Sequence, residues 1–478
     1  MRKPSFAQLL EIENAPAFLA YRCPSSGALL WPLVRNQFFR QLISDLYYQE
    51  APLVAAVPAV PRRQALVSLS RVILHNMGQR KMSGNILVIG TGAGSFLRDG
   101  LCFNRITDYL VQASPSDTVT VEGLVDWSVP RPRWNQRVSY WLPWQGAITV
   151  SGRMLRRNSH IVMAREIVEY ARRRAHDLLG LSIAELQVDM LVGMLSRKIA
   201  RLPVVHYAYR RLLEKVRPRL ILLEQACYGD FSPINQVARE MGIRVAEPQH
   251  GMVSGGHDAY CYAPLLRDST EYRACLPHDF LGYGAWWNEQ INMPVNKWVI
   301  GHPHYSEQRS RSLPSLTGVQ SDILLLGDGI EFSLYLTLAS ELAELLRGQY
   351  RIVLRPHPLE RSEVYRRYPD GKIGDVVIDT NRDIYSSFIS AYAVAGEVST
   401  GLFEALGIAG KVLLWETPKA QFSYPCHPFV GFLNAKSFVE ELRKPVGDAS
   451  SVVEEDIWAR DWVGNYKHYL GQVLGANG

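Results

Sequence analysis

Short apolar runs alternate along most of the chain with longer segments in which apolar residues recur every three to four positions. Apolar runs of four to eight residues between turn residues are typical of buried strands, and the longer periodic segments are typical of amphipathic helices. The strands expected in the first half are 85–90, 118–125, 220–224, 243–247 and 298–301. This alternation predicts parallel βαβ units and an α/β fold.

A second series of strands and helices follows the polar stretch HPHYSEQRSRSLPSLTGVQS. Its expected strands are 322–327, 351–354, 376–379, 391–396 and 411–415, and its expected helices are 333–346, 362–368, 382–390 and 401–408. We therefore expect two Rossmann-like domains. The expected parts are an N-terminal domain at 1–305 with helical additions in 1–80 and 150–215, a linker at 306–321, and a C-terminal domain at 322–478 with a terminal helix over 452–474.

Length and composition agree with two globular domains. The 478 residues exceed what one hydrophobic core usually serves, and 47% hydrophobic with 21% charged residues excludes a disordered chain. A net charge of +6 is too diffuse to indicate nucleic acid, but it suits anionic ligands or an anionic membrane surface. The cysteines form no C-x-x-C pair, and neither a signal peptide nor a membrane-spanning run is present, so we expect a cytoplasmic protein.

Two motifs of the second series point to a phosphate ligand. In RPHP the prolines end the strand at 351–354, so Arg355 and His357 are expected at the carboxyl edge of the sheet, where open α/β sheets bind ligands. In STGLFEAL, Ser399 and Thr400 stand at a strand-to-helix switch, where free N–H groups attract phosphate. Glu404, one turn later, can accept from ribose hydroxyls. A plain hydroxyl cap is the alternative for the Ser–Thr pair.

The stretch VAEPQHGMVSGGHDAYCY leaves an expected strand and carries many polar side chains among glycines. Its candidate substrate residues are Gln249, His250, Gly251, His257 and Tyr260. Glycines allow a close approach of the backbone to a ligand, which favours a substrate loop. A satisfied structural loop is one alternative. A metal pair of two histidines is another, although no third ligand stands at a recognised spacing.

Two acids near the first-domain strand LILLE are candidates for a general base. Glu224 ends the strand, and Asp230 follows in a turn. Asp230 is the preferred base because a turn exposes it, whereas Glu224 ends an apolar run. The alternative is that Asp230 caps the following helix. The glycines of VIGTGAGS miss the G-x-G-x-x-G spacing, so a dinucleotide cofactor is not expected.

Taken together, QHGMVSGGHDAY, GYGAWWNEQI with IGHPHY, LLLGDG, RPHP and STGLFEAL resemble motifs of the GT-B glycosyltransferases of bacterial capsule and lipopolysaccharide synthesis. The similarity is to Kdo transferases and bacterial sialyl- and polysialyltransferases, and it covers about Leu220 to Trp415 in family order. The resemblance implies a GT-B fold and a nucleotide-sugar donor, often CMP-linked. It places the donor on His357, Pro358, Ser399 and Thr400, with Asp328 and Gly329 beside it.

One departure from the family pattern moves the expected catalytic residue. Sialyltransferase relatives take their base from the first acid of an acidic-acidic-glycine motif, and the matching triplet here is Gly327-Asp328-Gly329. Because that first acid is missing, the expected base is Asp230 or Glu224. His250 is expected either to orient the base or to bind the donor carboxylate.

The expected function is transfer of a sugar, such as Kdo or another ulosonic acid, to a glycan or lipid-linked glycan, without metal or cofactor. One rival is a CDP-polyol phosphotransferase, whose motifs also pair a QHG-like loop with PHP. Another is a non-catalytic scaffold at the inner face of a bacterial membrane. The basic, aromatic stretches that begin at Arg62 and at Arg131 favour membrane contact, with a solvated helix face as the alternative.

Overall fold

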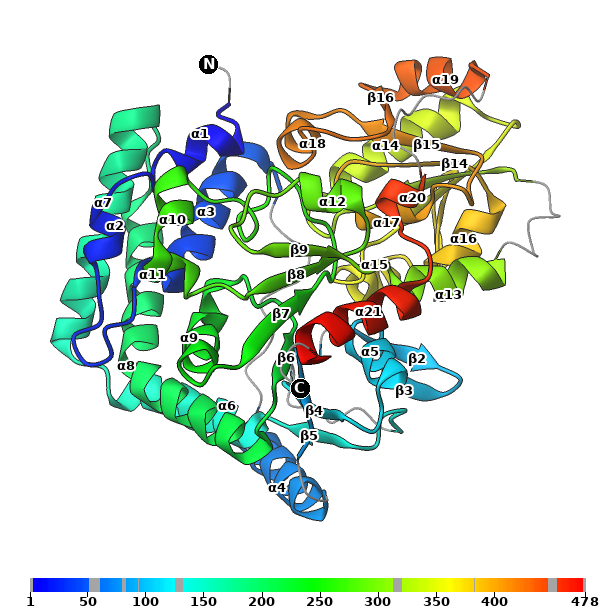
Figure 1. The fold of residues 1–478 in the computed structure, drawn as a ribbon. Helices are drawn as coiled ribbons and strands as arrows, with labels where there is room; N and C mark the ends of the chain where they lie inside the picture. The colour runs from blue at the N-terminus through cyan, green and yellow to red at the C-terminus, as the bar shows by residue number, and fades with distance from the viewer. Residues whose placement is uncertain are drawn as a thin grey trace.

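The computed structural model describes residues 3–50, 61–79, 83–92, 94–124, 132–312, 320–381, 383–445 and 454–475. Two seven-stranded sheets form the centres of two α/β domains, with strand orders β5-β4-β1-β6-β7-β8-β9 and β12-β13-β11-β10-β14-β15-β16 (Figure 1). The fold class predicted from the sequence, two Rossmann-like domains with helical additions, is confirmed.

The first sheet is parallel throughout. Its strands are β1 (Ile86–Gly90), β4 (Thr118–Glu122), β5 (Val138–Tyr140), β6 (Leu220–Leu223), β7 (Arg244–Pro248), β8 (Asp279–Gly282) and β9 (Asn296–Val299). The hairpin of β2 (Ser95–Arg98) and β3 (Leu101–Asn104) lies outside this sheet. Because all seven strands run the same way, their carboxyl ends meet at one edge.

Long helices enlarge the first domain, as the sequence predicts. Those of the N-terminal half are α1 (Phe6–Leu10), α2 (Ala17–Ala20), α3 (Trp31–Tyr47), α4 (Arg62–Gly78), α5 (Thr107–Ala113), α6 (Leu142–Met154), α7 (Asn158–Leu179) and α8 (Glu185–Val216). The 3-10 turn η1 (Gly229–Phe231) follows β6, and the remaining helices are α9 (Ser232–Glu240), α10 (Pro264–Asp268), α11 (Thr270–Arg273), α12 (Ala285–Glu289) and α13 (Pro303–Ser312). No helix within the described ranges is both long and apolar enough to cross a membrane.

The second sheet is parallel except for β12 at one edge. Its strands are β10 (Asp322–Leu326), β11 (Arg351–Arg355), β12 (Lys372–Ile373), β13 (Val376–Ile378), β14 (Ala391–Gly396), β15 (Lys411–Trp415) and β16 (Val430–Phe432). Its helices are α14 (Phe332–Leu345), α15 (Arg361–Arg367), α16 (Ile384–Ser390), α17 (Thr400–Glu404), α18 (Pro418–Ser423) and α19 (Ala435–Arg443).

The end of the chain returns to the first domain. Helices α20 (Glu454–Ile457) and α21 (Trp462–Gly475) follow the second sheet, and Tyr466 and Tyr469 of α21 pack against the first one (Figure 1). The Tyr469 hydroxyl donates to Asp279 of β8 at 2.9 Å. The predicted linker begins inside α13, and 313–319 lie outside the described residues. The bounds 1–305 and 322–478 stay our proposal, although the terminal helix α21 packs on the first domain.

Aromatic packing brings the two domains together. The ring centroids of Trp287 and Phe403 are 4.4 Å apart, and the indole of Trp458 donates to the Phe403 carbonyl at 3.1 Å. The loop 249–263 after β7, which we call the QHG loop, contains Gly256, and a Cβ added there would lie 2.2 Å from the carbonyl oxygen of Phe422 in α18. That loop therefore packs directly on the second domain, and only glycine permits this approach.

Candidate active site

Buried glutamates mark the carboxyl edge of the first sheet. The strand register sets Glu122 beside Gly90, places Glu224 next to Gly90 on the other side, and brings Glu247 opposite the last residue of β6. All three carboxyl groups are almost fully buried. Burial raises the pKa of Glu122 and of Glu247 to about 7, and it raises the pKa of Glu224 above its ordinary value.

Each of these carboxylates has partners inside the first domain. Glu122 forms an ion pair with Arg133 at 2.6 Å, and Glu224 accepts from the backbone N–H of Thr91 at 2.8 Å. Glu247 accepts from the backbone N–H of Cys227 at 2.6 Å. Because the carboxylates are covered and engaged, they are suited to support a neighbouring group rather than to touch substrate themselves.

His250 is the member of this group that reaches the surface. Its side chain is 16% exposed, whereas that of Glu247 is fully buried. Its Nδ1 lies 3.6 Å from Glu247 Oε1 and 3.5 Å from the Tyr260 hydroxyl, which itself donates to Glu247 at 2.6 Å. Burial lowers the pKa of His250 to about 3, so the imidazole is neutral at neutral pH and offers a ring nitrogen that can accept a hydrogen bond from a substrate hydroxyl.

The other predicted residues of the QHG loop mainly hold the loop in shape. The Gln249 amide donates to the Gly251 carbonyl and accepts from the Tyr283 N–H, each at 2.8 Å. His257 Nδ1 accepts from a backbone N–H two residues on at 3.1 Å, and burial lowers its pKa to about 4. The predicted substrate role of Gln249, His257 and Tyr260 is therefore confined to positioning His250 and the glycines around it.

Asp230, which the sequence analysis favours as the base, lies against helices α3 and α8 and not beside Glu224, Glu247 and His250. Its carboxylate is 2.5 Å from the Lys198 ammonium of α8, and that ammonium also donates to the Leu33 carbonyl of α3. The preceding N–H, of Gly229, donates to Asn36 of α3 at 3.2 Å. The turn after β6 is exposed, as predicted, but it is turned toward the helical additions. All described contacts of Asp230 are thus with the first domain.

In the RPHP motif of the second domain, Arg355 is a buried structural residue, whereas His357 is partly exposed. Arg355 is buried and forms an ion pair with Asp379 at 2.5 Å, which ties β11 to the segment after β13. Its contact with a donor phosphate stays a prediction, and this pair shows that its guanidinium also has a structural role. His357 is only partly buried, and a Cβ at Gly329 would lie 2.7 Å from its Nδ1. With φ at +86°, Gly329 is the residue that lets the imidazole pack here. Pro358 follows His357 in the same loop.

Local packing explains why Gly327 stands where sialyltransferase relatives carry the first acid of their acidic-acidic-glycine motif. A Cβ at Gly327 would lie 2.8 Å from Glu360 Oε1, so the carboxyl group of Glu360 takes the space that a side chain at 327 would enter. Glu360 accepts from the His357 N–H at 2.8 Å, and burial raises its pKa to about 7. A side chain at 327 would have to displace the Glu360 carboxyl group from the RPHP loop, so the packing here favours glycine.

The Ser–Thr motif begins α17 as a hydroxyl cap. Ser399 Oγ accepts from the Gly401 N–H at 3.1 Å, so one of the free N–H groups at this end is already satisfied. Thr400 is the first residue of the helix and stays partly exposed. Glu404 is buried and accepts from the Tyr385 hydroxyl at 2.5 Å. Ser399 and Thr400 are both partly exposed, and Thr400 is the one of the two whose hydroxyl does not cap the helix.

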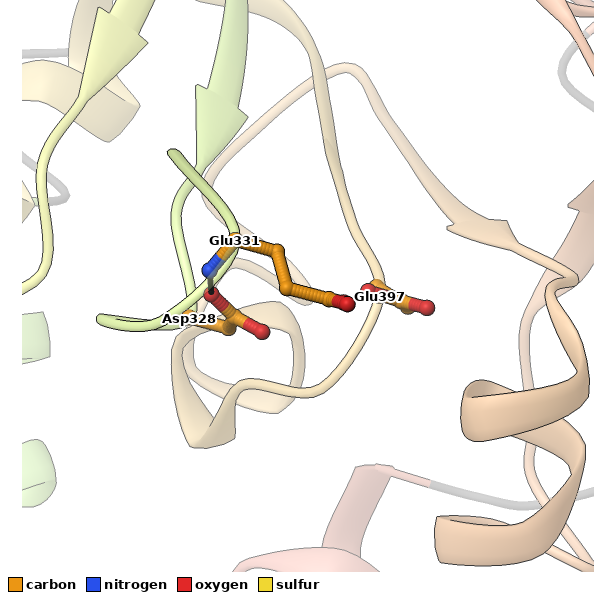
Figure 2. Close-up of side chains that lie close together, drawn as sticks. All are labelled: Asp328, Glu331 and Glu397. Atoms are coloured by element: carbon orange, nitrogen blue, oxygen red, sulfur yellow. Dashed lines mark hydrogen bonds between the residues drawn. The ribbon is translucent and has the colours of Figure 1, made fainter. Parts of the chain in front are cut away.

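Three acids at the edge of the second sheet surround a lysine. Asp328, Glu331 and Glu397 converge, close enough to hold a metal ion (Figure 2). The Lys419 ammonium pairs with all three, and it lies 2.6 Å from Asp328. Although burial opposes it, the Lys419 charge holds the pKa of Asp328 below its ordinary value. Asp328 also accepts from the N–H of Glu331 at 2.9 Å, so the predicted donor residue is occupied within the protein.

Two histidines of IGHPHY join the site, and they were not singled out from the sequence. The His302 ring stacks on Tyr283 at 4.0 Å between centroids. His304 Nδ1 lies 3.3 Å from the Tyr109 hydroxyl, and its ring is 5.9 Å from that of Tyr385 in the second domain. Burial lowers the pKa of both histidines, so they are neutral hydrogen-bonding groups between the two sheets.

Arg105 is the second residue that the sequence reading missed. It is exposed in the turn between β3 and α5, and no hydrogen bond or ion pair of its guanidinium exists within the described part of the chain. A Cβ at Gly90 would lie 3.6 Å from Asn104, 3.4 Å from Thr107 and 3.7 Å from Glu224. The residues on both sides of Arg105 thus pack at the glutamate edge.

The charge of Arg105 affects pKa values in both domains. Burial and then the Arg105 charge lower the pKa of His304 to about 3. Burial raises the pKa of Glu404 in the second domain, and the Arg105 charge opposes that rise. A guanidinium that is exposed, without a partner among the described residues and within electrostatic reach of both sheets is suited to bind an anion between them.

Comparison with known proteins gives similarity of structure alone. No family model and no curated protein matches the chain. Among solved structures, UDP-GlcNAc 2-epimerase from Neisseria meningitidis bound to UDP-GlcNAc is 11% identical, with a TM-score of 0.41 over 82% of this chain and 99% of that one. MurG from Acinetobacter baumannii is 8% identical, with a TM-score of 0.40 over 82% and 99%. The wall teichoic acid polymerase TagF is 10% identical, with a TM-score of 0.41 over 87% and 97%. Similarity at this level says nothing about the reaction of this chain.

Proposed function

We propose that the chain is a glycosyltransferase that moves a sugar from a nucleotide-sugar donor to a glycan acceptor between its two domains. The observation that carries the proposal is that the Arg105 charge acts on the pKa of His250 in the first domain and on that of His357 in the second, behind burial in both cases. Arg105 and His250 come from the first domain, and His357 and Thr400 come from the second. An anion binder, a proton acceptor and a neutral imidazole within one interdomain site are what transfer from a phosphate-linked donor requires.

The roles follow from exposure and charge. Arg105 and His357 bind the donor phosphate from opposite domains, and their hydrogen bonds stabilise the negative charge that develops as the nucleotide leaves. His250 takes the proton of the acceptor hydroxyl, while Glu247 behind it stabilises the imidazolium that forms. Because burial lowers the pKa of His250 to about 3, this role requires the Glu247 carboxyl group, 3.6 Å away, and the bound donor phosphate to raise that pKa toward neutrality. Glu224 supports the backbone beside Gly90.

For the finer assignment, we propose a CMP-linked ulosonic acid such as Kdo as the donor and a glycan or lipid-linked glycan of a bacterial surface polysaccharide as the acceptor. The support is the ordered set of motifs from the QHG loop to STGLFEAL. The test is a thermal-shift panel of CMP, CDP, UDP and GDP, because a nucleotide that binds only the native state raises its melting temperature. A response to CMP is expected. A response to CDP alone would favour transfer of a polyol phosphate.

Arg105→Gln is expected to weaken binding of the donor nucleotide by about tenfold to a hundredfold, because a charge-assisted contact to phosphate contributes about 1.5–3 kcal/mol. Isothermal titration with the nucleotide found in the panel measures this. Arg347→Gln is the matched control, since Arg347 is 73% exposed on the second domain and, among the described residues, has Asp375 as its ion-pair partner. Equal affinities of the two variants would remove Arg105 from the site.

His357→Ala is expected to weaken nucleotide binding by about 1–3 kcal/mol without unfolding the protein. The reason is that the imidazole sits at the carboxyl edge of the second sheet and is only partly buried. The same titration measures the loss, and circular dichroism checks that the variant is folded. Wild-type affinity in a folded His357→Ala variant would show that the nucleotide does not contact RPHP.

A further inference from the structure

Helices α4 and α6 pack side by side at the edge of the first sheet (Figure 1), although 63 residues separate their ends in the sequence. Together they leave a row of large apolar side chains in solvent, which we call the apolar-basic face. Its apolar members are Leu66, Ile73, Leu74 and Met77 of α4 and Val150 and Met154 of α6.

An ordinary surface helix turns its apolar side inward, whereas α4 leaves most of its large apolar residues outward. Leu66, Ile73 and Met77 recur at helical spacing on its outer side, and Met77 is 77% exposed. The inner side buries Val72 in a cluster with Val138 and Tyr140 of β5, and Asn76 Nδ2 donates to the Tyr140 carbonyl at 2.9 Å. His75 Nε2 lies 2.8 Å from the Val138 carbonyl. These contacts fix the helix with its apolar residues outward.

The charge around this face has one sign. Neither residues 61–79 nor residues 132–165 contain an aspartate or glutamate. The exposed cations are Arg63 and Arg71 on α4 and Arg153, Arg156 and Arg157 at the end of α6. Apolar side chains flanked by arginines, with no acid among them, complement a surface that is apolar inside and anionic outside.

A groove of about 630 Å³ opens beside the two helices. Trp141 and Trp144 at the start of α6 line it together with Arg211, Lys215, Arg217 and one acid, Glu214, which pairs with Arg211 at 3.3 Å. Trp141 stacks on Tyr209 with ring centroids 5.6 Å apart, which holds the indole in place. Indole rings favour the level of lipid headgroups, and cations bind headgroup phosphates. The groove therefore extends the apolar-basic face with groups of the same preference.

We propose that the apolar-basic face docks on the surface of an anionic phospholipid bilayer. Its leucine and methionine side chains insert at the level of the headgroups, and its arginines bind lipid phosphates. A second copy of this chain is a poorer occupant, because a two-fold contact through the face would set arginines against arginines. The inference does not depend on the proposed glycosyl transfer.

Sedimentation with vesicles tests this docking. Wild-type protein is expected to sediment with vesicles of phosphatidylcholine and phosphatidylglycerol, and to stay in the supernatant with phosphatidylcholine alone. Leu74→Asp with Met77→Asp is expected to weaken binding by about tenfold or more, since each apolar residue lost from the interface is replaced by a repelled charge. Leu186→Asp with Met190→Asp is the matched control, because these α8 residues are 73% and 55% exposed but lie beside Glu185 and Asp189.

The control pair is expected to bind as wild type does, and both pairs are expected to keep the wild-type circular dichroism spectrum. Three results would overturn the inference. The first is no binding of wild type to the anionic vesicles, and the second is equal loss of binding in both pairs. The third is a wild-type dimer, seen by analytical ultracentrifugation, that the α4 pair alone dissociates.

Discussion

Replacing His250 with asparagine is expected to lower the turnover of sugar transfer by about a hundredfold to ten-thousandfold, the range for a lost general base. Nucleotide affinity is expected to change little. Asparagine keeps a polar group in the loop but cannot take the proton of the acceptor hydroxyl. Glu247 cannot replace the imidazole, because its carboxyl group is fully buried and already accepts from Tyr260 and Cys227. Single-turnover kinetics with saturating donor measure the chemical step.

The comparison variant is Asp230→Asn. The sequence reading favours Asp230 as the base and would give the large loss here, whereas the pairing of Asp230 with Lys198 on the helical side leads us to expect nearly wild-type turnover. A hundredfold loss in Asp230→Asn together with normal turnover in His250→Asn would return the base to the turn after β6. Normal turnover in both would exclude these residues as the base.

Lys419→Met is expected to lower the free energy of unfolding of the second domain by about 3–5 kcal/mol near neutral pH. The substitution leaves the carboxylates of Asp328, Glu331 and Glu397 buried beside one another without a cation. Buried carboxylates without a partner have raised pKa values, and a raised pKa lowers stability as pH rises through it. The deficit is therefore expected to shrink between about pH 7 and about pH 5.

Urea unfolding followed by circular dichroism at both pH values measures this effect. Lys436→Met is the matched control, because Lys436 lies exposed on α19 of the same domain. The cluster also contacts the segment after α3: the Lys419 ammonium lies 4.9 Å from the ring of Tyr48, and Glu331 accepts from the Gln49 N–H at 2.6 Å. We therefore expect Lys419→Met to weaken the packing of this segment on the second domain as well. Equal unfolding midpoints of the two methionine variants would contradict the role given to the cluster.

The pattern of apolar runs predicts those strands that are long and fully apolar. The central strands β1, β6, β10 and β14 lie within one residue or so of their expected ranges, because both faces of a central strand are covered and its residues are apolar throughout. Strands that the pattern does not indicate are short, such as β5 with three residues and β12 with two. Their pairing partners, which are distant in sequence, define them.

The sequence predicts the motifs of the site better than the partners of each side chain. His250, His357 and Thr400 have surface at the edges of the two sheets, and STGLFEAL begins a helix as expected. The donor contact of Arg355 stays a prediction, and spacing could not indicate its internal partner Asp379, which follows another strand. Arg105 belongs to no motif. Its importance arises from tertiary packing of the turn between β3 and α5 against Gly90, which no local pattern shows.

The most direct test of the interdomain site is a structure of the protein with the nucleotide that raises its melting temperature most. We expect the phosphate to lie between Arg105 of the first domain and His357 of the second, with the open side of the ligand toward His250. A nucleotide that contacts neither Arg105 nor His250, or one that binds outside the space between the two sheets, would contradict the proposed site and the transfer assigned to it.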